Sequence, residues 1–510
     1  MNRSLIIFLF ISIFAVNLAG IFLIDVMDID ASTYASMGYE MLNTGNFLQV
    51  KERYEDHLDK PPFLFWISAL FYYLFGFSHI VYRIPQLLFT LLGLYATFRL
   101  GTHLYNRKTG ILAALILFSC QGWFMMAHDV RTDTILVNTI IFASWQIYRF
   151  LETGRMANLV GASAGVGIAM LTKGPIGLMV PLLAYIPELI YRKRIRDFLT
   201  WKLIIAVAII AVMLLPMLIG LYQQYGWKGI RFYFWTQSFG RITGENMMKD
   251  PLNDYFFFVH TFLWTFAPWA LLAIFGLISK IRGLIRERFD VKANNEVFVA
   301  GGALLPIIAL SFAQYKLPHY IFVTFPFFAI LTARYVVILF KEDIPGRSFR
   351  YLFPLQVTMN LVILILMVFL IVFVFPPELK LYWILPATLI ILCFFSLFIP
   401  RNKETRIIAG SVLAIISLNL ILNTWFYPHL MHYQAGSKAA RYVNEHHLNK
   451  KNIYLSRIDA HSFDIYAGTV VPFLDIQAIP AILKEKPTIW IFGDQEWMEE
   501  IRRSGLHIIQ

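Results

Sequence analysis

Two short acidic motifs flank the first polar stretch of the chain, and their residue types suit chemistry. Residues 28–34 (Asp-Ile-Asp-Ala-Ser-Thr-Tyr) follow the first apolar run, and residues 59–62 (Asp-Lys-Pro-Pro) open a second one. Charged groups are costly near lipid, so those found there usually serve a function. A carboxylate such as Asp30 can accept a proton from an attacking hydroxyl, and Lys60 can neutralise a phosphate. The two motifs therefore predict a site at the membrane surface.

Purely structural roles are also open to these residues. Asp30 or Ser32 suits the N-cap of a helix over about 31–42, which Gly45 would end. Lys60 can extend its ammonium group from an apolar surface to the membrane interface. The prolines after Lys60 fix the local backbone whichever role it has.

Isolated charges recur beside later apolar runs. Arg131 and Asp133 begin one run and either pair with each other or line the site. Lys173 and Lys316 each stand alone between apolar runs, which suits contact with a phosphate headgroup. Arg241 lies between two glycines in a long loop, where it either approaches an anion closely or is simply solvated.

The composition identifies the class of protein that must position these residues. Of 510 residues, 58% are hydrophobic and 15% are charged, whereas soluble domains have about 25% charged residues. This indicates a polytopic membrane protein. The net charge of +12 comes from Lys and Arg in short loops, where they set topology, so no nucleic-acid partner is expected. The two cysteines lie in apolar runs and predict neither a disulfide nor a metal site.

Thirteen apolar segments approach the roughly 20 residues that a membrane-spanning helix needs. They are 4–26, 83–105, 110–128, 133–151, 157–173, 175–191, 202–222, 254–279, 297–314, 319–340, 351–375, 381–399 and 406–426. The segment 63–77 is ambiguous.

The distribution of basic residues resolves this ambiguity. If 63–77 does not cross and the N-terminus is cytoplasmic, the clusters of Lys and Arg all fall in cytoplasmic loops, at 107–108, 149–155, 192–196, 280–288, 341–350 and 401–406. A crossing at 63–77 would reverse every later loop. We therefore expect 63–77 to lie in the interface or to re-enter. The acidic motifs and the isolated charges then share the external face.

The C-terminal part of the chain has a different character. Residues 427–510 are polar, and their pattern predicts a small extracytoplasmic α/β domain with helices at 437–449 and 495–503 and strands at 452–456 and 488–492. The predicted domains are thus 1–426, which includes the first external loop 27–82 with its juxtamembrane helices, and 427–510. His446, His447 and His461 have no metal-binding spacing and are interpreted as surface histidines.

These motifs together resemble the GT-C superfamily of membrane glycosyltransferases, families 39 and 83, which include protein O-mannosyltransferases and ArnT-like aminoarabinose transferases of lipid A. The resemblance covers roughly residues 5–340. It rests on motifs at 30–45, 59–62, 131–133, 171–175 and 316–320, in this order and spacing. It implies an all-α membrane fold with about thirteen transmembrane helices.

The resemblance also implies roles for individual residues. Asp30 would be the catalytic carboxylate, Lys60 and Arg241 would bind the donor phosphate, and several residues would line the cavity: Asp28, Tyr34, Asp59, Arg131, Asp133, Lys173 and Lys316. The chain departs from the family in two places. Ala31 follows Asp30 where the family often has Glu. Residues 236–238 lack the histidine that helps hold a metal in the aminoarabinose group. A divalent metal is therefore not predicted, and no other cofactor is implied.

The resulting expectation is an inverting glycosyltransferase in a membrane, with the bacterial inner membrane as its expected location. It would move a sugar from a polyprenyl-phosphate donor to a lipid A, protein or glycan acceptor on the extracytoplasmic face. The alternative is a polytopic transporter or lipid flippase, which would predict inverted repeats and broken helices. The sequence shows neither, and its polar motifs gather on one side. The sugar and the acceptor stay open.

Overall fold

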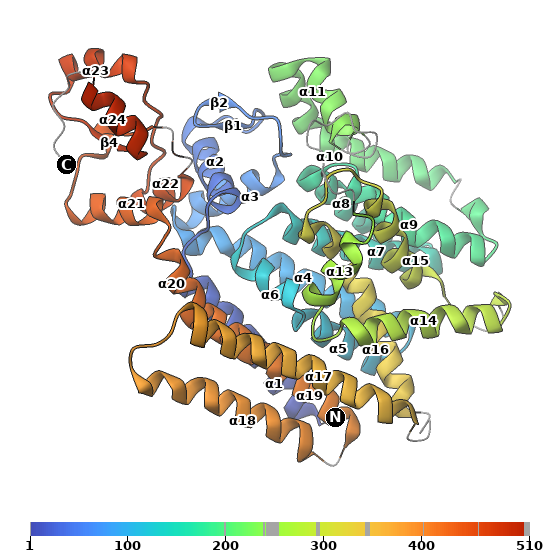
Figure 1. Cartoon of the computed structure of the whole chain (residues 1–510). Coiled ribbons are helices and arrows are strands. Elements are labelled where there is room, and N and C mark those ends of the chain that lie inside the picture. The colour runs from blue at the N-terminus through green and yellow to red at the C-terminus, as the bar shows by residue number, and fades with distance from the viewer. Residues whose placement is uncertain are drawn as a thin grey trace. The chain divides into compact units, whose positions relative to one another are not determined.

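The computed structural model describes residues 2–197, 200–237, 240, 254–291, 296–341, 347–400, 402–456, 458 and 460–503. Within these ranges the chain is predominantly helical, and its strands form two two-stranded sheets (Figure 1). The chain divides into two compact units. The first, Met1–Leu23 with Gln86–Tyr427, is called the helical unit. The second, Ile24–Pro85 with Pro428–Gln510, is called the composite unit.

Long apolar helices build the helical unit. They are α1 (Arg3–Leu23), α4 (His79–Leu104, from Gln86 onward), α5 (Arg107–Phe118), α6 (Gln121–His128), α7 (Thr132–Thr153), α8 (Met156–Lys173), α9 (Ile176–Tyr191), α10 (Trp201–Tyr225), α11 (Trp227–Arg231), α13 (Phe257–Thr265), α14 (Ala270–Arg286), α15 (Phe298–Ser311), α16 (Phe325–Lys341), α17 (Arg347–Phe369), α18 (Ile384–Phe398) and α19 (Lys403–Ile421). Figure 1 shows α17, α18 and α19 lying side by side.

All thirteen segments expected to span the membrane coincide with helices. Among the described residues, seven helices are long and apolar enough to cross, or nine if two bent pairs each count as one span. The remaining four segments form α7, α8, α9 and α15, so the total of thirteen crossings stays a prediction. Helix α3 (Phe63–Phe75) has 13 residues and is about 20 Å long. It is too short for a hydrocarbon core of roughly 30 Å, in line with the charge pattern.

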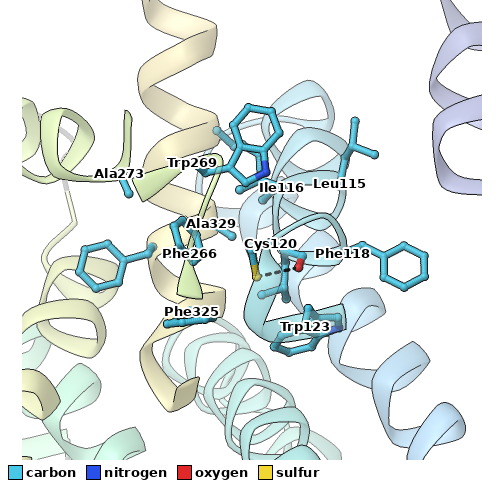
Figure 2. Packing of buried hydrophobic residues seen from close by; sticks show 14 of the residues in the cluster. Leu115, Ile116, Phe118, Cys120, Trp123, Phe266, Trp269, Ala273, Phe325 and Ala329 are labelled. Carbon is cyan, nitrogen blue, oxygen red and sulfur yellow. Dashed lines mark hydrogen bonds between the residues drawn. The ribbon is translucent and has the colours of Figure 1, made fainter. Parts of the chain in front are cut away.

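Two of the spans are broken, which the sequence did not predict. The axis turns by 60° between α5 and α6 and by 119° between α13 and α14. The two breaks meet, because the Gln121 amide donates to the Ala267 carbonyl at 3.0 Å. Near the breaks, Trp123, Phe266 and Trp269 belong to the buried hydrophobic cluster of which Figure 2 shows a part. The hydrogen bond between Gln121 and Ala267 pairs one amide and one carbonyl group of the two breaks inside the protein, as a membrane interior requires.

The composite unit joins the first loop to the C-terminal segment. It contains α2 (Asp30–Thr44), β1 (Lys51–Glu52), β2 (Glu55–Asp56), α3, α20 (Tyr427–Met431, from Pro428 onward), α21 (Ala435–Glu445), β3 (Ile453–Ser456), α22 (His461–Ala467), α23 (Ile479–Glu485), β4 (Trp490–Gly493) and α24 (Gln495–Arg503). Strands β1 and β2 are antiparallel, and β3 and β4 are parallel with Ile453 opposite Trp490.

The four expected C-terminal elements correspond to α21, β3, β4 and α24, but two helices that were not predicted, α22 and α23, lie between the strands. The domain division differs from the prediction, however, because residues 27–82 had been placed in the predicted transmembrane domain 1–426. In the structure residues 24–85 form one compact unit with 428–510. Helix α2 packs against α22, so the first loop shares its core with the C-terminal segment.

Candidate active site

Helices α2 and α3 bring the two acidic motifs to one end of a helix pair. Tyr34, near the start of α2, lies 5.9 Å from the Phe65 ring near the start of α3. Tyr39, further along α2, lies 6.2 Å from Tyr72, further along α3. The helices therefore run in the same direction. Their first turns, preceded by Lys60 and begun by Asp30, lie at the same end, where the positive ends of both helix dipoles favour an anion.

Asp30 is the first residue of α2. Ile29 occupies the N-cap and no side chain caps the helix, so the expected capping by Asp30 or Ser32 is wrong. The Ser32 hydroxyl instead bonds to the Asp28 carboxylate at 2.6 Å and the Ile29 carbonyl at 3.1 Å. The Tyr34 hydroxyl, one turn after Asp30, donates to its carboxylate at 3.4 Å. Gly45 ends the helix with φ of 68°, as predicted.

Asp59 and Lys60 form an ion pair just before α3. The Lys60 side chain is 19% exposed and that of Asp59 is 52% exposed. Pro62 is the N-cap residue of α3. Lys60 thus precedes the N-terminus of α3 by two residues and is paired with its neighbour Asp59.

Asp28 is bonded within the composite unit. Its two carboxylate oxygens accept hydrogen bonds from Ser32 and from both the amide and the hydroxyl of Ser462, at 2.6–2.8 Å. These contacts tie Asp28 to the start of α22, and its place among the residues lining the site stays a prediction.

The helical unit holds a second cluster of predicted residues. Lys173, at the end of α8, lies 2.6 Å from Asp133 at the start of α7. His319 approaches the other Asp133 oxygen at 3.7 Å. The Lys173 ammonium group lies 4.4 Å from the centre of the Tyr320 ring. The Asp133 side chain is only 4% exposed, and the Lys173 ammonium group matches its negative charge.

Arg131 and Asp133 do not form the direct ion pair that the sequence suggested. Arg131 is the N-cap residue of α7 with extended backbone. Its guanidinium binds Asp129 at 2.6 Å, while Asp133 binds Lys173. A sequence alone gives no sign that Asp133 and Lys173 meet.

Two other cations, Lys316 and Arg241, were predicted to belong to the site. Lys316 is buried and donates to the Asp254 carbonyl at 2.9 Å, beside the Tyr255 ring. The Asp254 carboxylate lies 2.8 Å from His260. Arg241 lies outside the described residues. Within the residues that the structure describes, no group of three or more His, Cys, Asp or Glu side chains is arranged to hold a metal.

His319 and Tyr320 were not assigned a role from the sequence. They belong to the motif at 316–320, whose lysine was assigned. The sequence did offer a signal for them, because these two polar residues directly follow Leu-Pro between two apolar runs. The chemistry of the two units can be described for each separately. The composite unit offers a carboxylate and a lysine beside helix N-termini, and the helical unit offers a fixed lysine with a histidine.

Comparisons with known proteins agree with this architecture. A family model described as dolichyl-phosphate-mannose-protein mannosyltransferase matches residues 59–219. An undecaprenyl phosphate-alpha-4-amino-4-deoxy-L-arabinose arabinosyl transferase of Edwardsiella ictaluri is 25% identical over 335 residues, which cover 63% of this chain and 57% of the relative. A Yersinia pestis protein of the same name is 25% identical over 316 residues, covering 60% of this chain and 54% of the relative. The chain thus spans little more than half the length of these relatives.

The crystal structure of ArnT from Cupriavidus metallidurans bound to undecaprenyl phosphate superimposes with a TM-score of 0.73. The sequences are 17% identical, and the match covers 96% of this chain and 90% of that one. The apo state of the same protein gives the same TM-score. The resemblance to GT-C glycosyltransferases that the motifs indicated is therefore confirmed at the level of the fold. The chain is an integral membrane protein with this fold.

Proposed function

We propose that this chain is an inverting glycosyltransferase that uses a sugar linked to a polyprenyl phosphate. The observation that carries the proposal is the shared end of α2 and α3, where Asp30 and Lys60 stand beside two helix N-termini. A carboxylate next to a cationic, anion-favouring surface is what transfer from a phosphate leaving group needs. The similarity to arabinosyl transferases of undecaprenyl phosphate supports this donor class.

In this reaction Lys60 binds the donor phosphate and neutralises the charge that grows on it as the bond to the sugar breaks. Arg241 is proposed to bind the same phosphate. In the helical unit, Lys173 is held rigidly by Asp133, so it is a second fixed cation that suits a phosphate headgroup. Arg131 and Lys316 are proposed to contact the lipid-linked substrates as well.

Asp30 acts on the acceptor. If the acceptor is a hydroxyl, Asp30 takes up its proton as the oxygen attacks the sugar carbon. If the acceptor is itself a phosphate, no strong base is required and Asp30 orients the reacting groups. The Tyr34 hydroxyl bonds to Asp30 in either case and orients its carboxylate. Lipid A, a protein or another glycan is the proposed acceptor, on the extracytoplasmic face of the bacterial inner membrane.

The broken helices bear on the transporter alternative, because that alternative predicts them. In transporters such breaks expose backbone and charges that bind the transported ion or substrate. Here buried aromatic side chains surround the breaks at α5/α6 and α13/α14, and the Gln121 amide at one break donates to the Ala267 carbonyl at the other. Buried side chains therefore occupy the breaks where a transporter would bind its ion or substrate, which favours the enzyme over the transporter.

The test is transfer of radiolabelled sugar by the purified full-length protein from a panel of polyprenyl-phosphate sugars to membrane extract. Asp30→Asn should lower transfer at least about 10²-fold, the usual contribution of a positioned acid or base. Asp56→Asn, an exposed carboxylate on the β2 strand, is the matched control and should retain activity. Full activity in Asp30→Asn would refute the assignment of this residue. No transfer from any donor by a folded protein would favour the transporter.

A further inference from the structure

The start of α22 bonds directly to the chain on both sides of Asp30. The amide and hydroxyl of Ser462 bind the Asp28 carboxylate at 2.8 Å and 2.6 Å. The Asp464 carboxylate accepts a hydrogen bond at 2.7 Å from Ser36, in the second turn of α2. Ser462 and Asp464 are both fully buried. Helix α2 is thus held from its beginning and from its middle by one short C-terminal helix.

The hairpin between α2 and α3 is held by the same helix. Arg53 lies in the turn between β1 and β2, and its guanidinium binds Asp464 at 3.0 Å and the Val471 carbonyl. Glu52 binds His461 at 2.9 Å and His57 at 2.7 Å. The Arg53 side chain is only 2% exposed. Positive and negative charges from the first loop and from α22 are therefore interleaved in the interior of the composite unit.

The backbone of this hairpin is strained. Arg53 has φ of 51° and Tyr54 has φ of 71°, a left-handed conformation that turns of this kind normally assign to Gly, Asn or Asp. Residues in such conformations persist where the surroundings over-determine them. Here the buried arginine and the Glu40 carboxylate, which accepts a hydrogen bond from the Tyr54 amide at 2.8 Å, supply that constraint.

Buried ion pairs are an inefficient way to stabilise a fold, because apolar side chains of similar size often do as well. They are directional, however, since a charge that leaves its partner stays buried and unpaired. An apolar contact tolerates sliding, whereas the contacts of Asp464 with Arg53 and Ser36 admit one arrangement. The connection therefore suits a need for exact placement of α2, which begins at Asp30.

We propose that α22 is a positioning element for glycosyl transfer, in which Asp464 and Ser462 hold α2, and with it Asp30, in the working orientation. This inference rests on the proposed function and adds the C-terminal segment to it. Asp464 is a positioning residue that acts through α2 and the hairpin. The C-terminal segment 428–510 thus contributes to placing Asp30, although its sequence shows no catalytic motif.

The test compares Asp464→Asn with Lys51→Met in the full-length protein. Asn keeps the shape of Asp464 but removes the charge that matches Arg53. Lys51 belongs to an exposed ion pair on the same hairpin, 4.0 Å from Asp56, so it is the matched control. Asp464→Asn should lower kcat on the order of 10²-fold, the effect of a small misplacement of a reacting group. The KM for the donor should change less than about threefold, because Asp464 contacts α2 and the hairpin, whereas Lys60 lies further along the chain, just before α3.

Hydrogen exchange of the α2 amides supplies a readout that is independent of activity. Asp464→Asn should speed this exchange, and Lys51→Met should leave both exchange and kcat unchanged. Unchanged exchange would show that α22 does not hold α2. Faster exchange with a normal kcat would show that the placement of α2 does not matter for transfer. Either result overturns the proposal.

Two other results are possible, a failure of Asp464→Asn to fold and a failure of the wild-type protein to transfer sugar, and each has its own test. If Asp464→Asn does not fold, Ser462→Ala removes one hydroxyl contact with Asp28 and carries the same pair of readouts. If the wild-type protein transfers no sugar from any donor, the proposed function fails. The exchange measurement then decides by itself whether α22 holds α2.

Discussion

The ion pair between Asp133 and Lys173 gives a quantitative test of the site in the helical unit. Its atoms lie 2.6 Å apart, and the two side chains are 4% and 15% exposed. At an effective dielectric constant of about 20, unit charges at this distance attract by roughly 6 kcal/mol. Desolvation offsets part of this attraction. Removing one partner of a buried pair therefore costs about 3–5 kcal/mol, because the other charge stays buried without compensation.

We expect Lys173→Met to lower the free energy of unfolding by about 3–5 kcal/mol. The double variant Asp133→Leu with Lys173→Met removes both charges, so it should recover most of this loss. A remainder of about 1 kcal/mol is expected, because the contact between the Lys173 ammonium group and the Tyr320 ring is also lost.

Unfolding by sodium dodecyl sulfate in mixed micelles, followed by far-ultraviolet circular dichroism, measures these differences. Lys51→Met breaks an exposed pair and should cost at most about 1 kcal/mol. The reasoning is refuted if Lys173→Met stays within about 1 kcal/mol of the wild type, since the pair would then be solvated. It is refuted equally if the double variant is no more stable than Lys173→Met, because an unpaired Asp133 would then not be the cause.

Two other predictions concern the composite unit and the helix contacts. Hydrogen bonds from His461 and His57 lower the pKa of Glu52 below its usual 4.5. Burial alone would lower the pKa of His461, but Asp464 and Glu52 outweigh it and raise this pKa above 6.5. The contribution of Glu52 and His461 to the stability of the composite unit should thus be full between pH 4.5 and 6.5. This contribution should fall at lower pH as Glu52 gains a proton, and at higher pH as His461 loses one. In thermal unfolding scans, His461→Gln should abolish the loss of stability at high pH. In the helical unit, Gly110→Ala should lower the free energy of unfolding by about 1–3 kcal/mol in the same detergent titration. The new Cβ would lie 2.4 Å from the Phe98 carbonyl oxygen, a backbone atom that cannot move aside. Unchanged stability would show that α4 and α5 can separate.

Much of the fold follows from local features of the sequence. Apolar runs of spanning length, bounded by charges, located the helices, and Gly45 marked the end of α2 through its left-handed backbone. The break after α5 was missed, because Ser119 and Cys120 are compatible with a continuous helix. It arises from packing, where the Trp269 indole donates to the Ser119 hydroxyl at 2.9 Å.

The site was predictable in its residue types but not in its pairings. Arg131, which is near in sequence, was one candidate partner for Asp133, yet Asp133 pairs with Lys173 at the end of the next helix. His461 was expected at the surface because it stands in a polar segment. It is 1% exposed, because Glu52 of the first loop supplies the carboxylate that makes its burial possible. Contacts between segments so distant in sequence leave no local pattern.

The composite unit also constrains how the protein is made. Its two segments, 24–85 and 428–510, are separated by about 340 residues of the other unit, and translation of that length takes on the order of 20–70 s. During this interval the first loop has emerged from the ribosome, but the residues that neutralise Arg53 have not yet been synthesised. Until then the Arg53 guanidinium group lacks the Asp464 carboxylate that it binds in the finished structure. Completion of the carboxyl-terminal segment supplies this carboxylate, so a nascent chain acquires an ordered Asp30 loop only after nearly all of its helices have been inserted.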